Sequence, residues 1–284
     1  MCVGGDESTG VTATGRAALV LVVTRPQPQA DRWVADLGRR GVAALALPLI
    51  RIEALAGRAV LEHSWARLPA YRAVMFVSQV AVQHYFDGHL ALPFQTALDG
   101  GLRLWATGRG TRQALLRQGV LAQQIDCPGP DSPQFDSEAL WSVVAGSLQA
   151  GGRVLVVRGE DGAALPDADG QFRGSGRDWL SRRLGDAGVL VESLAVYRRC
   201  MPSWDDTQRE RARQAACGHA VWVFTSGQAI GHLLTLLPAQ EWGGQRALAT
   251  HPRVAAAARA AGFGVVLESR PGLDALLASI ESLA

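Results

Sequence analysis

The chain has 284 residues, of which 48% are hydrophobic and 19% are charged, a composition typical of globular proteins that bury ordinary cores. The length favours two domains, and the formal net charge of +2 is too small to indicate a nucleic-acid-binding protein. No apolar run reaches the ~20 residues that span a bilayer, so no membrane segment is predicted.

The cysteines show neither a C-x-x-C spacing nor a neighbouring histidine cluster, so no metal site and no disulfide framework is predicted. They are interpreted as the reduced thiols of a cytoplasmic protein: Cys2, Cys127, Cys200 and Cys217. The apolar run after Arg16 lacks a small-residue cleavage site, and it is interpreted as a strand rather than a signal peptide.

The first predicted elements form a strand–helix–strand unit. Residues 1–16 are rich in Gly and Thr and are predicted to be a disordered tail. Residues 19–24 form a continuous aliphatic run, which is typical of a strand buried on both faces. A helix is expected to begin near two prolines and to end before Gly41, followed by a strand over 42–47. This unit implies a parallel strand pair with a right-handed crossover.

Two extended connectors interrupt the alternation of strands and helices. The first is Pro48-Leu49-Ile50-Arg51-Ile52, which a proline opens and in which Arg51 interrupts the apolar residues. The second is Ala195-Val196-Tyr197-Arg198-Arg199, which stops before Pro202.

The rest of the chain alternates predicted strands with predicted helices, the pattern of a parallel α/β sheet. Strands are predicted over 73–77, 102–106, 120–125, 153–157, 189–194, 220–224, 246–250 and 264–267. Helices are predicted over 60–68, 79–87, 110–118, 136–148, 177–187, 205–216, 227–237, 252–261 and 272–282. The Gly-rich, acidic segment 160–176 is predicted to be a surface loop, with a lid over the site as the alternative.

Three strand-and-turn segments recur along the chain. The pairs are 73–78 with 220–226, 104–109 with 247–253, and 21–25 with 155–159. Each is a buried strand that turns sharply into a helix, and ligands of parallel α/β sheets bind beyond the carboxyl ends of such strands. Free N–H groups and the helix dipole favour anions there. The repeat therefore predicts two related α/β domains facing a polyanionic ligand.

Five motifs, taken in order, cover nearly all of the chain after residue 17 and resemble the uroporphyrinogen-III synthase family. They are Val23-Thr24-Arg25-Pro26; Leu47-Pro48-Leu49-Ile50-Arg51-Ile52; Thr107-Gly108-Arg109-Gly110-Thr111; Val156-Val157-Arg158-Gly159-Glu160 with Val196-Tyr197-Arg198-Arg199; and Phe224-Thr225-Ser226 with His251-Pro252-Arg253. The family usually has Thr-Ser-x-Asn where this chain has Val77-Ser78-Gln79-Val80, and this departure weakens the case for that turn as a contact.

The resemblance implies two flavodoxin-like or Rossmann-like parallel-sheet domains joined by a two-stranded hinge. One domain would combine residues 17–47 with 203–284, and the other would span 54–194. The connectors, taken as 48–53 and 195–202, would form the hinge and allow the domains to move. The repeat by itself would instead divide the chain near Gly151.

The implied reaction is that of a cyclising hydro-lyase. Hydroxymethylbilane, a linear tetrapyrrole with eight carboxylates, would lose water, invert its D ring and close to uroporphyrinogen III. The resemblance implies no metal and no organic cofactor. A monomer is expected, and a transient contact with the upstream hydroxymethylbilane synthase is compatible with this reaction. The alternatives are a non-catalytic two-domain binder of a polycarboxylate and a degenerate relative without activity.

Two residues are candidates for the chemistry. Tyr197 matches the family's tyrosine and would donate a proton or a hydrogen bond to the leaving hydroxyl; the alternative is a hinge aromatic that packs against Leu49 or Ile50. Thr111 matches a family threonine and would bind a carboxylate or position the leaving group; the alternative is a helix cap.

The remaining candidates would bind substrate carboxylates or hydrogen-bond the substrate. They are Arg25, Ser78, Gly108, Arg158, Gly159, Thr225, Ser226, His251 and Arg253. Arg25 and Arg158 follow strands as expected for carboxylate clamps, with surface arginines as the alternative. His251 is favoured as a hydrogen-bonding group over a proton donor, and Arg253 is as readily a solvent-facing residue as a clamp.

Overall fold

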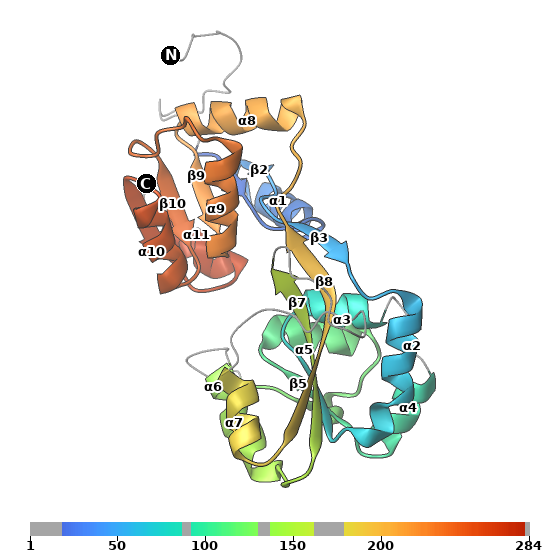
Figure 1. Ribbon diagram of the computed structural model, residues 1–284. Helices are drawn as coiled ribbons and strands as arrows, with labels where there is room; N and C mark the ends of the chain where they lie inside the picture. Colours follow the sequence, from blue (N-terminus) through green and yellow to red (C-terminus); the bar gives the residue numbers. More distant parts are fainter. Residues whose placement is uncertain (1–18, 87–91, 130–136, 162–178, 282–284) are drawn as a thin grey trace. The chain divides into compact units, whose positions relative to one another are not determined.

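The computed structural model describes residues 19–86, 92–129, 137–161 and 179–281. The chain divides into two compact units, and we describe each by itself (Figure 1). Unit 1 consists of Met1–Ile52 and Cys200–Ala284, and unit 2 is Glu53–Arg199. The predicted tail and nearly all of the predicted loop over 160–176 lie outside the described residues.

Among the described residues, unit 1 contains a five-stranded sheet in the order β11-β10-β9-β1-β2, and every neighbouring pair is parallel. The strands are β1 (Leu21–Val23), β2 (Ala44–Ala46), β9 (Val221–Phe224), β10 (Arg246–Ala249) and β11 (Val265–Glu268). The helices are α1 (Gln29–Arg39), α8 (Asp206–Cys217), α9 (Gly227–Leu236), α10 (Pro252–Ala260) and α11 (Leu273–Glu281).

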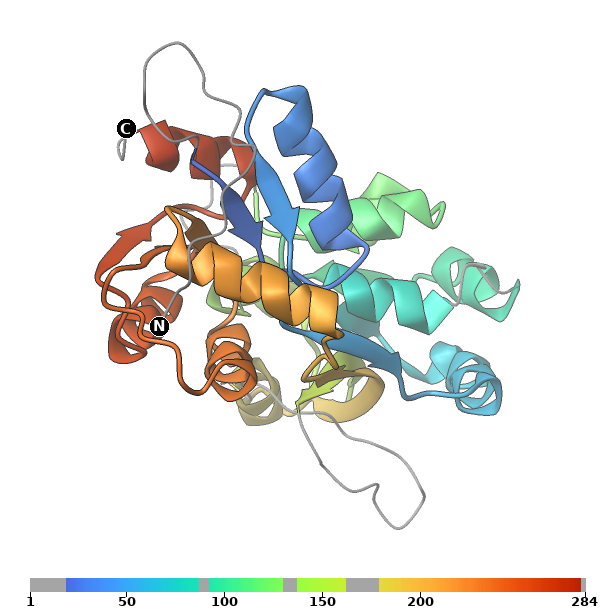
Figure 2. The ribbon, with the colours of Figure 1, turned by 90° about the horizontal axis from the view of Figure 1, so that it is seen from above.

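Alternate strand residues of unit 1 face opposite helix layers, as the two-residue period of a strand requires. Val22 and Trp222 face the core under α8, α9 and α10, whereas Val23 and Val223 face the core under α1 and α11. In Figure 2, α1 and α8 accordingly lie on opposite sides of β1 and β2. Gly41, at φ 74°, ends α1 in the left-handed conformation that glycine tolerates best.

The described part of unit 2 contains a six-stranded sheet in the order β3-β8-β7-β4-β5-β6. The strands are β3 (Arg51–Ala54), β4 (Ala73–Phe76), β5 (Arg103–Ala106), β6 (Ile125–Asp126), β7 (Arg153–Asp161) and β8 (Leu190–Cys200). The helices are α2 (Arg58–Ala66), α3 (Gln79–Phe86), α4 (Leu92–Asp99), α5 (Arg109–Arg117), α6 (Ser137–Val144) and α7 (Trp179–Asp186), with 3-10 turns at Leu68–Ala70, Ala122–Gln124 and Ala145–Ser147.

One face of the unit 2 sheet packs on α6 and α7, where Met75 and Trp105 join Leu140 and Leu184 in one core. On β4, Phe76 instead contacts the rings of Tyr85 and Phe86 in α3, with centroids 5.5 and 5.8 Å away. The predicted α/β class with parallel sheets is therefore confirmed.

The two segments that cross between the units belong to neighbouring strands. β3 contains the boundary after Ile52, and β8 contains the boundary after Arg199. The two strands are hydrogen-bonded neighbours in the unit 2 sheet. The second predicted connector is therefore no separate element, because β8 runs without a break through Tyr197 to Cys200. A hinge movement about these strands stays a prediction.

The two sheets are versions of one arrangement. Strands β8-β7-β4-β5-β6 of unit 2 correspond in order and direction to β2-β1-β9-β10-β11 of unit 1. The pairing Val156↔Met75 corresponds to Val23↔Val223, which makes Arg158 equivalent to Arg25. The sequence repeat therefore reflects the fold, but its pair 21–25 with 155–159 is misaligned by one residue, since it places Arg25 opposite Gly159.

Two predictions of local structure were wrong. The helix α4 was not predicted, and it lies between two elements that were expected to follow one another directly. The strand expected over 120–125 is mostly a 3-10 turn over Ala122–Gln124, and only Ile125 and Asp126 pair with β5.

Candidate functional site

Each sheet has one place where the strand order reverses, and ligands of open α/β folds bind beyond the carboxyl ends of the strands at such a place. In unit 2 the chain proceeds from β4 to β5 and β6 on one side and from β7 to β8 on the other. In unit 1 the same reversal falls between β9 and β1. We call these places the unit 2 and unit 1 switch points.

Tyr197 lies at the unit 2 switch point. On β7, Val157 pairs with Phe76, the last residue of β4. Two residues farther along β7, Gly159 pairs with Tyr197 of β8. A β-bulge between Arg158 and Gly159 shifts the register there. The Tyr197 ring rests against Gly159 so closely that a Cβ at position 159 would lie 2.3 Å from Cζ and 2.7 Å from the hydroxyl oxygen. Glycine is therefore required beneath the ring.

Ser78 holds the Tyr197 hydroxyl. Its Oγ lies 3.2 Å from Tyr197 Oη and accepts a hydrogen bond from the backbone N–H of Ala81 at 3.0 Å. Because Ser78 still has its own proton, it can donate to the phenolic oxygen and leave the phenolic proton directed elsewhere. Tyr197 is 3% exposed, so its contact with Ser78 is largely shielded from solvent.

The turn after β5 lies beside the same edge. Thr107 donates a hydrogen bond from Oγ1 to the carbonyl of Val77 at 3.1 Å and so links the turns after β5 and β4. Gly108 is the N-cap residue of α5 and, lacking a side chain, leaves the first N–H groups of the helix without a side-chain cap. Thr111 is buried in the first turn of α5, so the alternative interpretation of Thr111 as the cap residue is wrong.

Two charged residues of β7 flank Gly159. Arg158 is 6% exposed and Glu160 is 3% exposed. Arg158 was expected either to clamp a carboxylate or to lie on the surface, and its burial contradicts the surface alternative. A ligand contact by Arg158 stays a proposal.

At the unit 1 switch point, Thr24 donates a hydrogen bond from Oγ1 to the carbonyl of Val223 at 2.7 Å and links β1 to β9. Arg25 donates from Nε and Nη2 to Gln29 Oε1 at 3.1 and 2.7 Å, and its guanidinium carbon lies 4.7 Å from the Trp33 ring centroid. Burial lowers the pKa of Arg25 from its ordinary value, although the group stays charged near neutrality. This cation is thus held in place at the carboxyl end of β1.

The helix after β9 begins at Ser226, whose Oγ accepts the backbone N–H of Gln228 at 3.2 Å. Ser226 is therefore a cap residue, which is compatible with its predicted contact with substrate. Thr225 lies between the strand and this cap and is partly exposed.

The helix after β10 begins at His251, whose Nδ1 accepts the backbone N–H of Arg253 at 3.1 Å. A nitrogen that accepts a hydrogen bond carries no proton, so Nε2 bears the proton of the neutral ring. This geometry favours the hydrogen-bonding role expected for His251. Both side chains are exposed, so a solvent-facing Arg253 remains as open as a carboxylate clamp.

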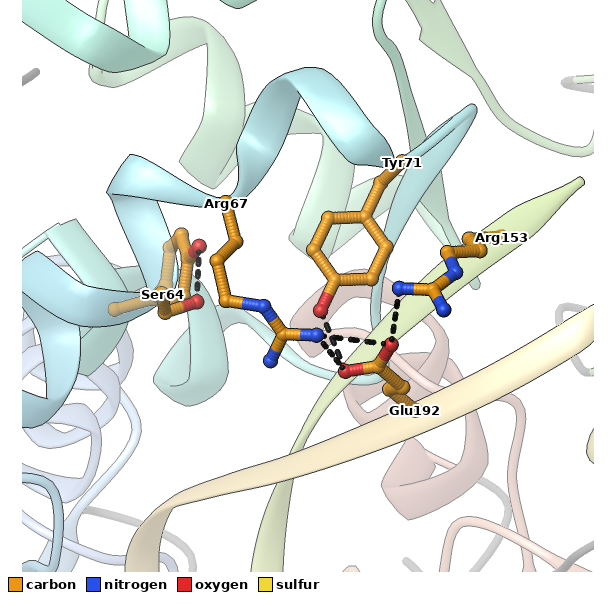
Figure 3. Close-up of polar contacts among 6 residues, drawn as sticks. Ser64, Arg67, Tyr71, Arg153 and Glu192 are labelled. Atoms are coloured by element: carbon orange, nitrogen blue, oxygen red, sulfur yellow. Dashed lines mark hydrogen bonds and ion pairs between the residues drawn. The ribbon is translucent and has the colours of Figure 1, made fainter.

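A second polar cluster lies at the opposite, amino edge of the unit 2 sheet (Figure 3). The carboxylate of Glu192 accepts hydrogen bonds from Tyr71 at 2.7 Å and from Arg67 at 2.9 Å, and it lies 3.5 Å from Arg153 Nη1. Burial and the bond to Glu192 raise the pKa of Tyr71 to about 12. Because these charges satisfy one another away from the switch point, the cluster stabilises the edge where β7 and β8 begin.

One residue at the unit 2 switch point was missed by the sequence analysis. His84 of α3 stacks on Tyr197, with ring centroids 5.9 Å apart and an interplanar angle of 25°. No motif distinguishes this histidine in the sequence, because its neighbour lies on a distant strand.

The described helices include none that is both long and apolar enough to cross a membrane.

Sequence comparisons agree on one family. A family model described as "Uroporphyrinogen-III synthase HemD" matches residues 31–278. A "Uroporphyrinogen-III synthase" of Chlorobaculum parvum is 30% identical over 201 residues, which cover 66% of this chain and 67% of that protein. A protein of the same name from Salmonella typhimurium is 28% identical over 275 residues, which cover 92% of this chain and 99% of that protein.

Solved structures support the fold. The uroporphyrinogen-III synthetase of Helicobacter pylori has a TM-score of 0.57 at 14% identity, covering 94% of this chain and 100% of that one. A mutant uroporphyrinogen III synthase of Thermus thermophilus has a TM-score of 0.52 at 15% identity, covering 93% of this chain and 98% of that one. Identities this low carry the architecture alone.

Proposed function

Since the chain belongs to the uroporphyrinogen-III synthase family, we propose that it converts hydroxymethylbilane to uroporphyrinogen III, as a hydro-lyase that closes the macrocycle with inversion of ring D. The observation that carries this proposal is the Tyr197 hydroxyl, held by Ser78 at the unit 2 switch point. A proton donor in that place suits a reaction that begins with the loss of a hydroxyl group.

The proposed first step breaks the bond between the terminal carbon and its hydroxyl oxygen. Tyr197 gives its phenolic proton to the departing hydroxyl, which leaves as water. The lone pair of the pyrrole nitrogen shifts into the ring, so that a double bond forms between the ring and the terminal carbon. Donation from Ser78 to the phenolate oxygen stabilises the charge that remains on Tyr197. Inversion of ring D requires that its original bond to the bridging methylene breaks while two new carbon–carbon bonds form, one at each α carbon of the ring. The α carbon that carried hydrogen gives up this proton, which returns to the phenolate.

The substrate's eight carboxylates need several anion-binding groups. In unit 1, the candidate groups are Arg25 and the start of α9, which Ser226 caps. In unit 2, they are Arg158 and the start of α5 at Gly108, which no side chain caps. We propose these residues, with Thr111, Gly159, Thr225, His251 and Arg253, as substrate contacts. Orientation of rings A and D by such contacts would supply much of the rate, because the intermediate is reactive once formed.

The test is an isomer analysis. Hydroxymethylbilane is generated in place by its synthase, incubated with the folded protein, oxidised, and the porphyrin isomers are separated against a protein-free control. The proposal predicts mostly isomer III. Isomer I alone, at the rate of the control, would contradict it and would leave a polycarboxylate binder.

A further inference from the structure

Three residues from two segments of unit 2 contact the Tyr197 side chain. Gly159 of β7 lies beneath it, Ser78 holds the hydroxyl, and His84 of α3 stacks on the ring. His84 has no assigned part in the mechanism derived so far. Its side chain is partly exposed, whereas Tyr197 is buried.

Ser78 and His84 belong to one segment, α3 and the residue before it. Ser78 accepts the backbone N–H of Ala81 and so begins α3, and His84 lies farther along the same helix. The Tyr197 side chain contacts the first residue before α3 through its hydroxyl and a later residue of α3 through its ring. Helix α3 and the residue before it thus contact both the hydroxyl and the ring of Tyr197, which belongs to strand β8.

We propose that His84 is a positioning residue, whose ring keeps the Tyr197 hydroxyl directed at Ser78. This inference rests on the proposed function. The near-parallel rings, at 25° and 5.9 Å, have the offset geometry in which aromatic pairs attract. A permanent cation is already near the ring, since the guanidinium carbon of Arg199 lies 6.0 Å from its centroid. His84 is thereby assigned a packing role, which a neutral aromatic ring can take over.

The test compares His84→Ala and His84→Phe with His63→Ala, which removes an exposed histidine from α2 of the same unit. His84→Ala is expected to lower kcat about fivefold with KM within about twofold, because a stacking contact of ordinary strength is lost. His84→Phe restores the stack and is expected to return kcat to within about twofold of the wild type. His63→Ala is expected to leave both constants unchanged.

A second readout needs no activity. Tetranitromethane nitrates accessible tyrosines, and mass spectrometry locates the product. Tyr197 is expected to be protected in the wild type and in His84→Phe, and to react faster in His84→Ala. Unchanged kcat and unchanged nitration in His84→Ala would overturn the inference, as would a His84→Phe protein as slow as His84→Ala. A wild type that forms only isomer I would defeat the proposed function, while nitration would still decide the role of His84.

Discussion

Units 1 and 2 carry the same strand order, yet the last part of one equivalent strand differs in chemistry. β2 of unit 1 ends at Ala46, and Ile50 lies in the segment that follows it, whereas the equivalent strand β8 of unit 2 continues to Cys200 and carries Tyr197. Ile50 is part of the apolar core of unit 1, whereas Tyr197 reaches a serine hydroxyl at the switch point. The two units therefore share an arrangement of five strands, but the chain beyond Ser193 of unit 2 carries a phenol, whereas the chain beyond Ala46 of unit 1 carries an aliphatic side chain.

The serines at the two switch points sharpen this contrast. Ser78 and Ser226 each lie two residues after a buried strand and cap the helix that follows. Only Ser78 also contacts a phenol, and all three tyrosines of the sequence belong to unit 2. The account therefore predicts that equivalent changes in the two units affect stability alike but catalysis differently.

The largest effect is expected for Tyr197→Phe. Loss of the proton donor should lower kcat about 100-fold, the lower end of the range for a positioned acid, with KM within about twofold. Its control in the apolar core of unit 1, Ile50→Val, should cost about 1 kcal/mol of unfolding free energy and leave kcat unchanged. Steady-state isomer III formation and urea unfolding measure both. A Tyr197→Phe protein with wild-type kcat would remove the contrast between the units.

Gly159→Ala should have the next largest effect. The new methyl group would overlap Tyr197 and must displace its ring, so kcat should fall about tenfold or more, and overpacking should cost about 1–3 kcal/mol of stability. Gly38→Ala in α1 is the control, because its added Cβ meets nothing within 4 Å. That variant should be more stable by up to about 1 kcal/mol and fully active. Equal kcat in both proteins would refute the close contact at Gly159.

The serine pair gives a smaller difference. Ser78→Ala and Ser226→Ala should each cost about 1 kcal/mol of stability through a lost helix cap. Ser78→Ala should in addition lower kcat about fivefold with KM little changed, since the Tyr197 hydroxyl loses its partner. Ser226→Ala should act mainly on KM. Thermal unfolding and kinetics on both variants test this, and matching kinetic losses would argue against an asymmetric site.

The smallest effect concerns the amino edge of unit 2. A tyrosine whose pKa is raised from 10 to about 12 contributes stability that is complete below pH 10 and is lost as the pH rises through 12. The sequence has no lysine, so few other groups titrate in that window. Tyr71→Phe should reduce the alkaline loss of stability by about 1–2 kcal/mol, allowing for the partly exposed partners. Urea midpoints at pH 9 and 11.5 measure it.

Tyr85, whose pKa burial also raises, should retain part of the alkaline loss in the Tyr71→Phe protein. An alkaline profile identical to that of the wild type would show that the bond between Tyr71 and Glu192 contributes nothing.

Local patterns predicted the strands and the turns after them, because buried parallel strands have a continuous aliphatic signature. They did not predict the short helix α4. They also did not predict the bounds of the two-residue strand β6, which pairing at the edge of the sheet sets rather than local propensity. The register of the repeat was one residue off, since counting along a chain cannot show which residues pair across a sheet.

Candidate residues such as Tyr197 and Ser78 were predicted separately, whereas their contact was not. They lie 119 residues apart in the chain, and the bulge beside Gly159 brings them together. The need for glycine at 159 and the stack with His84 are likewise properties of tertiary packing.

The most direct test of the central claim is a double-mutant cycle on kcat. Ser78→Ala and Ser226→Ala are each combined with Tyr197→Phe, and all proteins are assayed for isomer III. The account predicts that Ser78→Ala loses its effect on kcat once the phenolic hydroxyl is gone, while Ser226→Ala has the same effect with or without it. Independent effects of Ser78 and Tyr197, or equal coupling of both serines to Tyr197, would contradict a proton donor held by unit 2 alone.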